Sequence, residues 1–230
     1  MSPRVLASSW SGVYESTWHN PGLFWLAIAL FFAVLAVRIG GLAGFLVAFG
    51  LEILADCTLT GGLTPVASPS TAATTAGIVF VILGDLRYFW LVEAGAAGDG
   101  LRRHALPSLG LAVIVPVANA VAHRALPTVF ASARITFLVY EVMMLALVAA
   151  HGVWRHRRPG LDARGPGGRR FVRALLGFEL LQYGLWATAD VLLLQGVDVA
   201  HLLRLVPNTM YYALFLPFVL LRSPRLEVPA

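Results

Sequence analysis

Seven acidic residues lie inside apolar stretches of the sequence, where charged side chains are rare. They are Glu52, Asp56, Asp85, Glu93, Glu141, Glu179 and Asp190. A carboxylate at the centre of a bilayer costs about 2.5–3.5 kcal/mol even on lenient scales, so it normally faces an internal cavity or a partner. The one basic residue expected at comparable depth is Arg87. Because a single cation cannot neutralise seven acids, we expect a polar site enclosed among helices.

Carboxylic acids combined with aromatic rings suit an acid-initiated reaction of a lipophilic substrate. A carboxylic acid in an apolar pocket can keep its proton and act as a general acid. The chain also has 13 Phe, 6 Trp and 6 Tyr residues, and ring faces stabilise a cation in a water-excluded site. Protonation of an alkene or an epoxide, followed by ring closure, would use both groups. An isoprenoid would reach such a site directly from the bilayer.

Other chemistries are excluded by residues and motifs that the sequence lacks. It has no lysine, which excludes a retinal Schiff base. A single cysteine, Cys57, excludes an internal disulfide and a cysteine-based metal site. The sequence has no G-x-S-x-G motif, no P-loop and no dinucleotide fingerprint. The histidines fall at span ends or in loops, and His123 is expected to be solvated. We therefore expect no metal and no organic cofactor.

The elements that must position the acids are apolar spans. Windows of about 19 residues place seven of them near 22–39, 42–58, 74–94, 107–123, 135–153, 171–194 and 205–221. The chain is 58% hydrophobic and 13% charged, with a mean hydropathy of +0.77, outside the range of soluble domains. The sequence therefore predicts an all-α, multi-pass protein of the cell membrane. Residues 1–230 are predicted to form a single bundle of seven transmembrane helices.

The distribution of arginine sets the predicted orientation. Most arginines fall in segments that are cytoplasmic if the N-terminus lies outside and the C-terminus inside. The longest of these segments, 154–170, is rich in Gly, Pro and Arg and is predicted to be a cytoplasmic connector. It has few interleaved aromatic residues, so we expect the bilayer, and not nucleic acid, as the partner of this basic chain.

This orientation brings most of the polar residues to the outer half of the bundle. Glu52 and Asp56 are four residues apart and share a helical face. Regular spacing along the sixth span predicts one polar stripe: Glu179, Gln182, Tyr183, Trp186 and Asp190. The simplest geometry is a cavity that opens outward.

Three charged residues of the third span are predicted to lie at other depths in the membrane. Asp85 and Arg87 lie near mid-membrane but do not face each other, because residues two apart point in different directions on a helix. Arg87 is therefore expected to form a structural ion pair with Glu141 or Glu179. Glu93 lies at the inner boundary, where exposure to head groups or cytosol is expected.

Three short segments carry a resemblance to a known family. They are AFGLEILADCTLTG around Glu52, LGDLRYFWLVE in the third span, and Asn208-Thr-Met-Tyr211 in the seventh. They resemble the small seven-span membrane terpene cyclases of fungal meroterpenoid and indole-diterpene pathways, which also have bacterial relatives. The resemblance implies that Glu52 matches the family's essential second-span glutamate, although Leu51 replaces the usual tryptophan. The family's seventh-span Asp-x-x-Tyr element keeps its tyrosine here but has Asn208 in place of the acid.

The leading prediction is a cofactor-independent, terpene cyclase-like enzyme acting on a lipophilic isoprenoid. Glu52 is the expected proton donor or a member of an acid network. Asp190 or Asp56 would replace the acid missing from the seventh span, and Asp85 is a further catalytic candidate. The residues predicted to bind substrate are mostly aromatic or amide side chains: Tyr88, Asn119, Glu141, Trp186, Asn208, Tyr211 and Tyr212.

Two other functions remain open from the sequence. An excess of intramembrane acids favours a transporter or channel for a cation or a proton-coupled solute, to which Asn119, Gln182 and Asn208 would add oxygen ligands. Against transport, the sequence has no evident internal repeat. The third function is a sensor or accessory subunit whose polar residues hold a partner's helix.

Overall fold

The structure is a computed structural model of the 230-residue chain. It describes residues 9–14, 26, 33, 42–59, 70–97, 101–157 and 165–223. Every regular element in these ranges is helical, with no strand among them, which confirms the all-α prediction. The first predicted span, 22–39, lies outside the described residues except for two isolated positions.

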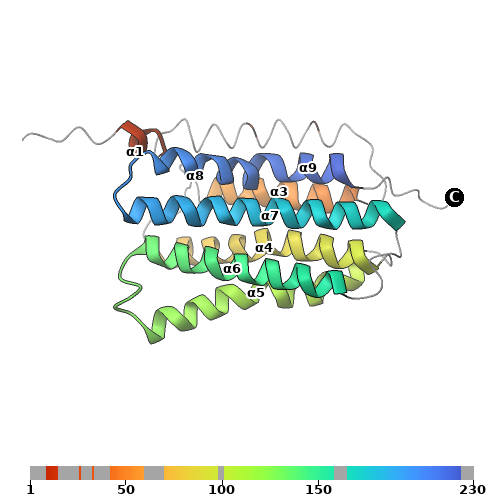
Figure 1. The fold of residues 1–230 in the computed structure, drawn as a ribbon, viewed down its shortest axis with the longest axis horizontal. Helices are drawn as coiled ribbons and strands as arrows, with labels where there is room; N and C mark the ends of the chain where they lie inside the picture. Colours follow the sequence, from red (N-terminus) through yellow and green to blue (C-terminus); the bar gives the residue numbers. More distant parts are fainter. Residues whose placement is uncertain are drawn as a thin grey trace, which may run out of the picture.

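The helices lie side by side in a single bundle, with α5 inclined to the others (Figure 1). Their bounds are α1 (Ser9–Tyr14), α3 (Ala43–Leu59), α4 (Thr71–Ala97), α5 (Leu101–Ala125), α6 (Ala133–Arg157), α7 (Gly165–Leu194), α8 (Ala200–Thr209), the π-helical segment η1 (Met210–Leu214) and α9 (Phe215–Arg222). Each predicted span from 42–58 onward coincides with one of these helices or, for the last, with α8, η1 and α9 together. The connector predicted at 154–170 is shorter, because α6 continues to Arg157 and α7 begins at Gly165.

Four helical stretches in the described part of the chain are long and apolar enough to cross a membrane. They are Thr74–Ala94, Arg103–Ala125, Ala133–Arg157 and Ala200–Arg222. The helix α3 has only 17 residues, and the apolar sequence of α7 is interrupted by Glu179, Gln182 and Asp190. The polarity of α7 faces inward, since all three side chains are buried.

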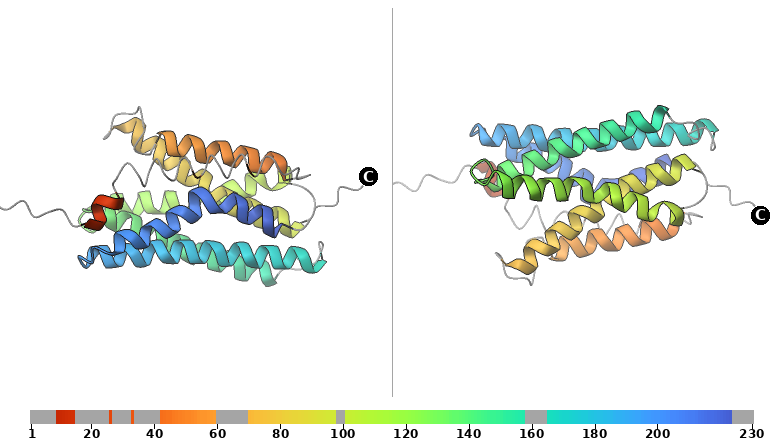
Figure 2. Two further views of the ribbon diagram at one scale, coloured as in Figure 1. Left: turned by 90° about the horizontal axis from the view of Figure 1, so that it is seen from above. Right: turned by 90° about the horizontal axis from the view of Figure 1, so that it is seen from below.

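The distribution of polarity is that of a membrane protein. Large apolar side chains cover much of the outside, where Leu106, Val121 and Leu221 are 78%, 61% and 81% exposed. The acids are inside instead. Bilayer-facing surfaces are apolar, and ionisable groups within spans face the bundle interior. The views from above and from below show α7 packed along α6 and α8 on one side of the bundle, with α3 on the opposite side (Figure 2).

The last span contains a π-helical segment between two prolines. Pro207 lies in α8, Pro217 lies in α9, and η1 lies between them. Proline has no N–H to donate to the preceding turn, and π-helical turns inside α-helices frequently occur at functional sites. In η1 the carbonyl of Tyr211 accepts a hydrogen bond from Nη1 of Arg87 at 3.1 Å. The irregular turn thus provides an acceptor for a buried cation.

A close approach between α4 and η1 depends on Gly84. A Cβ atom at this position would overlap the hydroxyl and ring of Tyr211, whereas a Cβ at Gly77 on the same helix would meet nothing within 4 Å. Gly84→Ala is expected to lower the free energy of unfolding by about 1–3 kcal/mol. Gly77→Ala is the matched control and should be neutral or stabilising. Thermal unfolding in detergent measures both, and equal tolerance of the two substitutions would contradict this packing.

Candidate functional site

All seven acids are buried, with exposures from 0% for Asp190 to 9% for Glu52, which confirms that they are enclosed. Contacts and charge interactions divide them among three clusters along the bundle: Asp190 with Glu141, Asp85 with Glu52, Asp56 and Glu179, and Glu93 by itself. We name these the Asp190 cluster, at the end where α1 lies, the Arg87 cluster, near the middle of α4, and the Glu93 cluster, at the opposite end (Figure 1).

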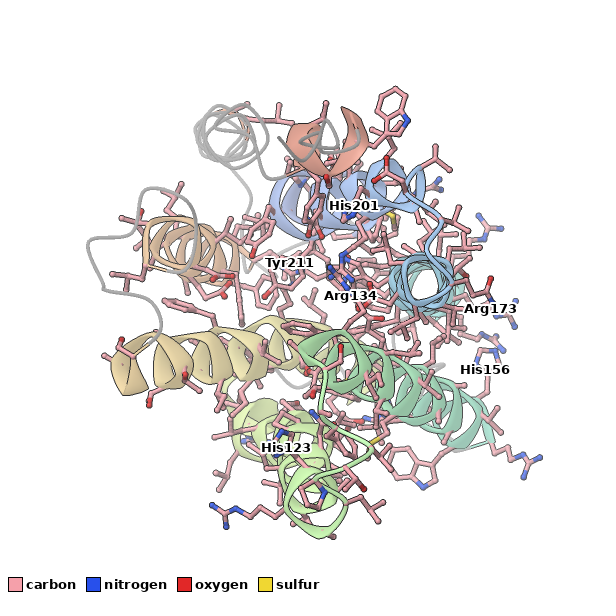
Figure 3. The ribbon with its side chains drawn as sticks, turned by 90° about the vertical axis from the view of Figure 1, so that its left-hand side faces the viewer. His123, Arg134, His156, Arg173, His201 and Tyr211 are labelled. Atoms are coloured by element: carbon pink, nitrogen blue, oxygen red, sulfur yellow. The ribbon has the colours of Figure 1, made fainter. Side chains whose placement is uncertain are left out.

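The Asp190 cluster is a network of two acids and two arginines. Oδ1 of Asp190 accepts hydrogen bonds from Nη1 of Arg134, at 3.1 Å, and from Nη1 of Arg204. Nη1 of Arg204 also lies 3.7 Å from Oε1 of Glu141. The side chain of Arg134 enters the bundle from the first turn of α6 (Figure 3). The expectation that Arg87 is the sole deep cation is wrong, because Arg204 is also buried.

Three further side chains complete this cluster. The Tyr14 hydroxyl accepts hydrogen bonds from Nε of Arg204 and Nδ2 of Asn208, both at 3.3 Å. Nε1 of Trp186 donates to Oδ1 of Asn208 at 2.8 Å. Three predicted substrate-binding residues, Glu141, Trp186 and Asn208, therefore lie around Asp190. Trp186 and Asn208 are hydrogen-bonded there, whereas Oε2 of Glu141 has no partner among the described residues.

The Glu93 cluster joins α4 to the last turns of α6. Oε1 of Glu93 lies 2.7 Å from Nε2 of His151 and accepts a hydrogen bond from Nε of Arg155 at 2.9 Å. Nη2 of Arg155 donates to the other carboxylate oxygen. The expectation that Glu93 is exposed at the boundary is wrong, because its side chain folds against basic groups of a neighbouring helix and is buried.

In the Arg87 cluster, Asp85 is held by two tyrosines. The hydroxyl of Tyr140 on α6 donates to Oδ2 of Asp85, and the hydroxyl of Tyr183 on α7 donates to Oδ1. Both carboxyl oxygens of Asp85 are thereby satisfied. The three side chains connect α4, α6 and α7 near the middle of the bundle.

Arg87 is fully buried and lies between two aromatic rings. Its guanidinium carbon is 4.0 Å from the ring centre of Tyr211 and 4.2 Å from that of Phe215, a geometry typical of cation–π contacts. The predicted ion pair with Glu141 or Glu179 is wrong: none of the described acids lies within ion-pair distance of Arg87. Its charge nevertheless acts on the nearby carboxyl groups of Glu52, Asp85 and Glu179.

Glu52 is the acid whose two carboxyl oxygens are both buried without a hydrogen-bond partner among the described residues, whereas Glu141 and Asp190 each have one such oxygen. Glu52 shares the inward face of α3 with Phe49 and with Asp56, whose charge also acts on it. Two nitrogens of Arg87, Nε and Nη2, are likewise buried without a partner in the described part of the chain. The hydrogen-bonding capacity of these groups is therefore available to a ligand or water.

The remaining predicted substrate-binding residues are dispersed. Tyr211 lies near Glu52, within electrostatic reach, and its ring centre is 4.7 Å from that of Tyr212. The Tyr88 ring is 6.1 Å from His151, which places it toward the Glu93 cluster. Asn119 lies on α5, and its buried Oδ1 has no partner among the described residues. His123 is exposed, as expected.

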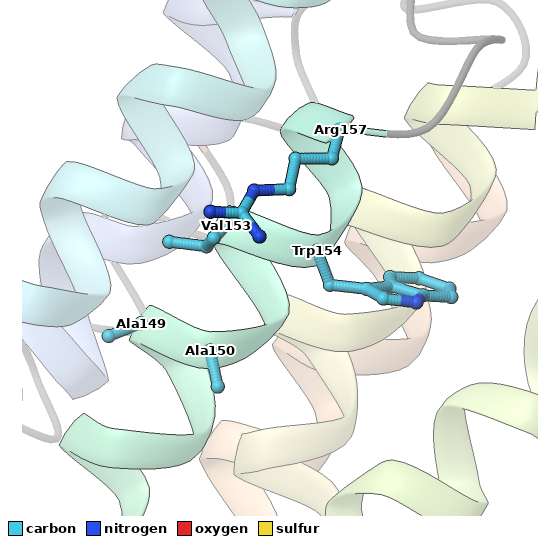
Figure 4. Close-up of a pocket in the computed structure, with 5 residues that line it drawn as sticks. All are labelled: Ala149, Ala150, Val153, Trp154 and Arg157. Atoms are coloured by element: carbon cyan, nitrogen blue, oxygen red, sulfur yellow. The ribbon is translucent and has the colours of Figure 1, made fainter.

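A surface groove lies apart from these clusters, on one face of α6. It has a volume of about 640 Å³ and is lined by Ala149, Ala150, Val153, Trp154 and Arg157 (Figure 4). All of these residues are exposed. The groove therefore faces outward and is not an entrance to Glu52.

Several partners of the acids were missed from the sequence. Tyr14, Arg134 and Arg204 lie outside the predicted spans. Hydropathy windows exclude charged span ends such as the two arginines, and Tyr14 precedes the first span. Tyr140 stands directly before Glu141 in an apolar stretch, and no sequence pattern indicates that it is a partner of Asp85. The basic last turn of α6 is a sequence pattern that could have indicated partners for Glu93.

Among the described residues, no three His, Cys, Asp or Glu side chains are grouped so as to hold a metal ion. Comparison of the chain with family models, with curated proteins and with solved structures gives no match. The function must therefore be inferred from the geometry of the site.

The Asp190 cluster leads to a prediction about stability. Asp190→Asn would leave Arg204 buried without its closest carboxylate, and loss of one partner from a buried ion pair costs about 3–5 kcal/mol. Arg134→Gln should cost at most about 1 kcal/mol, because the Arg134 side chain is 31% exposed. Unfolding in detergent, followed by circular dichroism, measures the difference. Small and equal effects would show that Asp190 does not hold this end of the bundle together.

Proposed function

We propose that the chain is an integral-membrane enzyme that protonates a lipophilic isoprenoid and directs its cyclisation. Glu52 is the proton donor. The observation that carries the proposal is the carboxyl group of Glu52, buried in the bundle with neither oxygen hydrogen-bonded to a described residue. Burying a polar group without a partner costs about 1–3 kcal/mol, and a substrate that accepts a proton from this group would supply the missing interaction.

Aromatic rings near Glu52 support this proposal. Phe49 lies one turn before Glu52 on the same face of α3, and its ring centre is 5.9 Å from that of Trp90 on α4 and 4.5 Å from that of Phe45. The rings of Tyr211 and Phe215 already carry a cation, the Arg87 guanidinium. A substrate carbocation would therefore be stabilised mainly by Phe45, Phe49 and Trp90.

The reaction is balanced without a cofactor. The O–H bond of Glu52 breaks, and its proton adds to an alkene carbon or to an epoxide oxygen of the substrate. The resulting electron-deficient carbon is attacked by a second alkene of the same molecule, and a carbon–carbon bond forms. Loss of a proton from the cyclic cation gives the product and restores the acid. The product is an isomer of the substrate.

The proposal includes seven membrane crossings in the cell membrane, with the N-terminus outside and the C-terminus in the cytoplasm. Residues 22–39 would form the first crossing, α3 to α7 the next five, and α8, η1 and α9 the last. The arginine distribution and the apolar outer surface support this arrangement. An isoprenoid dissolved in the bilayer would then enter laterally between helices.

A second candidate, proton or cation transport, is favoured by the succession of acids along the bundle. Asp190, then Asp85 and Glu179, then Glu93 occupy three successive levels, and chains of acidic residues across a membrane are typical of proton pathways. Both end clusters are compensated by arginine, which opposes free passage of a cation. We therefore place transport second.

The test of the enzyme is turnover of prenyl and epoxyprenyl substrates by membranes containing the chain. We expect products with the mass of the substrate, and one deuterium bound to carbon if an alkene is protonated in D₂O. Glu52→Gln, which preserves shape but has no acidic proton, should lower turnover by at least about 10²-fold. Liquid chromatography with mass spectrometry provides the measurement.

The control is Leu51→Ala on the same helix, because Leu51 is 55% exposed whereas Glu52 is buried. This variant should retain turnover. Equal turnover in Glu52→Gln and the parent chain would exclude Glu52 as the proton donor. If proteoliposomes instead show proton flux that Glu52→Gln abolishes, without any cyclised product, transport replaces the enzyme as the function.

A further inference from the structure

The groove on α6 has a composition that changes along its length. Its lining residues are spaced so that they form one continuous face of the helix, about 12 Å long at 1.5 Å per residue. At one end the lining is apolar, formed by Ala149, Ala150 and Val153, and at the other it is formed by Trp154 and Arg157. The apolar end lies within the candidate membrane span Ala133–Arg157. An occupant of this groove must therefore be apolar at one end and polar at the other.

The polar end of the groove carries the positive charge of Arg157. Arg157 makes no ion pair with any residue that the structure describes, and its side chain folds back along α6 toward Val153 (Figure 4). The first turns of the neighbouring α7 contain three more arginines, Arg169, Arg170 and Arg173. In the sequence from 151 to 173 the sole acid is Asp162. The occupant's polar end is therefore expected to be an anion.

Trp154 is held at the boundary between the apolar and basic ends. Its ring stacks on His151 at 5.8 Å between centres and lies 5.2 Å from the guanidinium carbon of Arg155. Tryptophan is enriched where membrane spans meet head groups. The groove thus changes from apolar to basic at a residue type common at the level of lipid head groups.

We propose that this groove binds one anionic phospholipid, with its phosphate at Arg157 and an acyl chain along Val153, Ala150 and Ala149. Basic pockets beside membrane helices bind anionic lipid head groups. A nucleic acid or an acidic protein would contact the arginines but would leave the apolar part of the groove, at membrane depth, unused. This site depends on the chain lying in a membrane and is independent of the reaction proposed at Glu52.

The experiment adds phosphatidylglycerol or phosphatidylcholine, with identical acyl chains, to the full chain purified in a zwitterionic detergent. Melting temperature and native mass spectrometry report binding. We expect phosphatidylglycerol to bind and to raise the melting temperature, and phosphatidylcholine to do neither. Arg157→Gln should weaken the apparent affinity about fivefold, the effect of one arginine near an anionic surface. Ala150→Phe, which fills the groove, should cause a similar loss.

Two matched controls separate a site from general charge and bulk. Arg103→Gln removes an exposed arginine at the same end of the bundle, from α5, and Val117→Phe adds a ring to an exposed position of α5. Both should bind phosphatidylglycerol as the parent chain does. The lipid-free melting temperatures of all four variants verify folding.

Three results would overturn the proposal. The first is equal binding of phosphatidylcholine, and the second is an equal loss of affinity in Arg103→Gln and Arg157→Gln. The third is a stabilisation by inorganic phosphate alone that matches that by phosphatidylglycerol, since the apolar part of the groove would then contribute nothing.

Discussion

The structure depends on how one buried cation is accommodated in the middle of an apolar bundle. The guanidinium of Arg87 lies between the rings of Tyr211 and Phe215, donates to a backbone carbonyl of the π-helical segment, and acts electrostatically on acids of α3, α4 and α7. This arrangement requires Tyr211 to approach α4 closely, which the absence of a side chain at Gly84 allows. The position of the last span is thereby coupled to the polar centre of the bundle.

The charges outside this centre are arranged differently. At one end Asp190 and Glu141 lie with Arg204 and Arg134, and at the other Glu93 lies with Arg155 and a histidine. In these clusters acids and arginines are close enough to compensate one another, as expected of structural networks. Among the described residues, the middle has several acids and one arginine, and both carboxyl oxygens of Glu52 lack a hydrogen-bond partner there. The carboxyl group of Glu52 therefore keeps its capacity to bind a ligand.

Local sequence patterns predicted the helices, the burial of the acids and the inward stripe of α7, because hydropathy and helical periodicity are properties of single segments. They did not predict the partners of those acids. The contact between Glu93 and Arg155 joins residues 62 positions apart, and that between Tyr14 and Arg204 joins residues 190 positions apart. Such pairings arise from the packing of helices against one another. The π-helical turn was not predicted either, although the two prolines that flank it were visible.

The proposed reaction requires that Glu52 holds a proton that it can transfer to a substrate. Infrared spectroscopy detects this proton, because a protonated carboxylic acid has a C=O stretching band distinct from that of a carboxylate. At neutral pH we expect such a band in the parent chain and in Leu51→Ala, and a weaker band in Glu52→Gln. An identical carboxylic-acid band in the parent chain and in Glu52→Gln would show that Glu52 holds no proton.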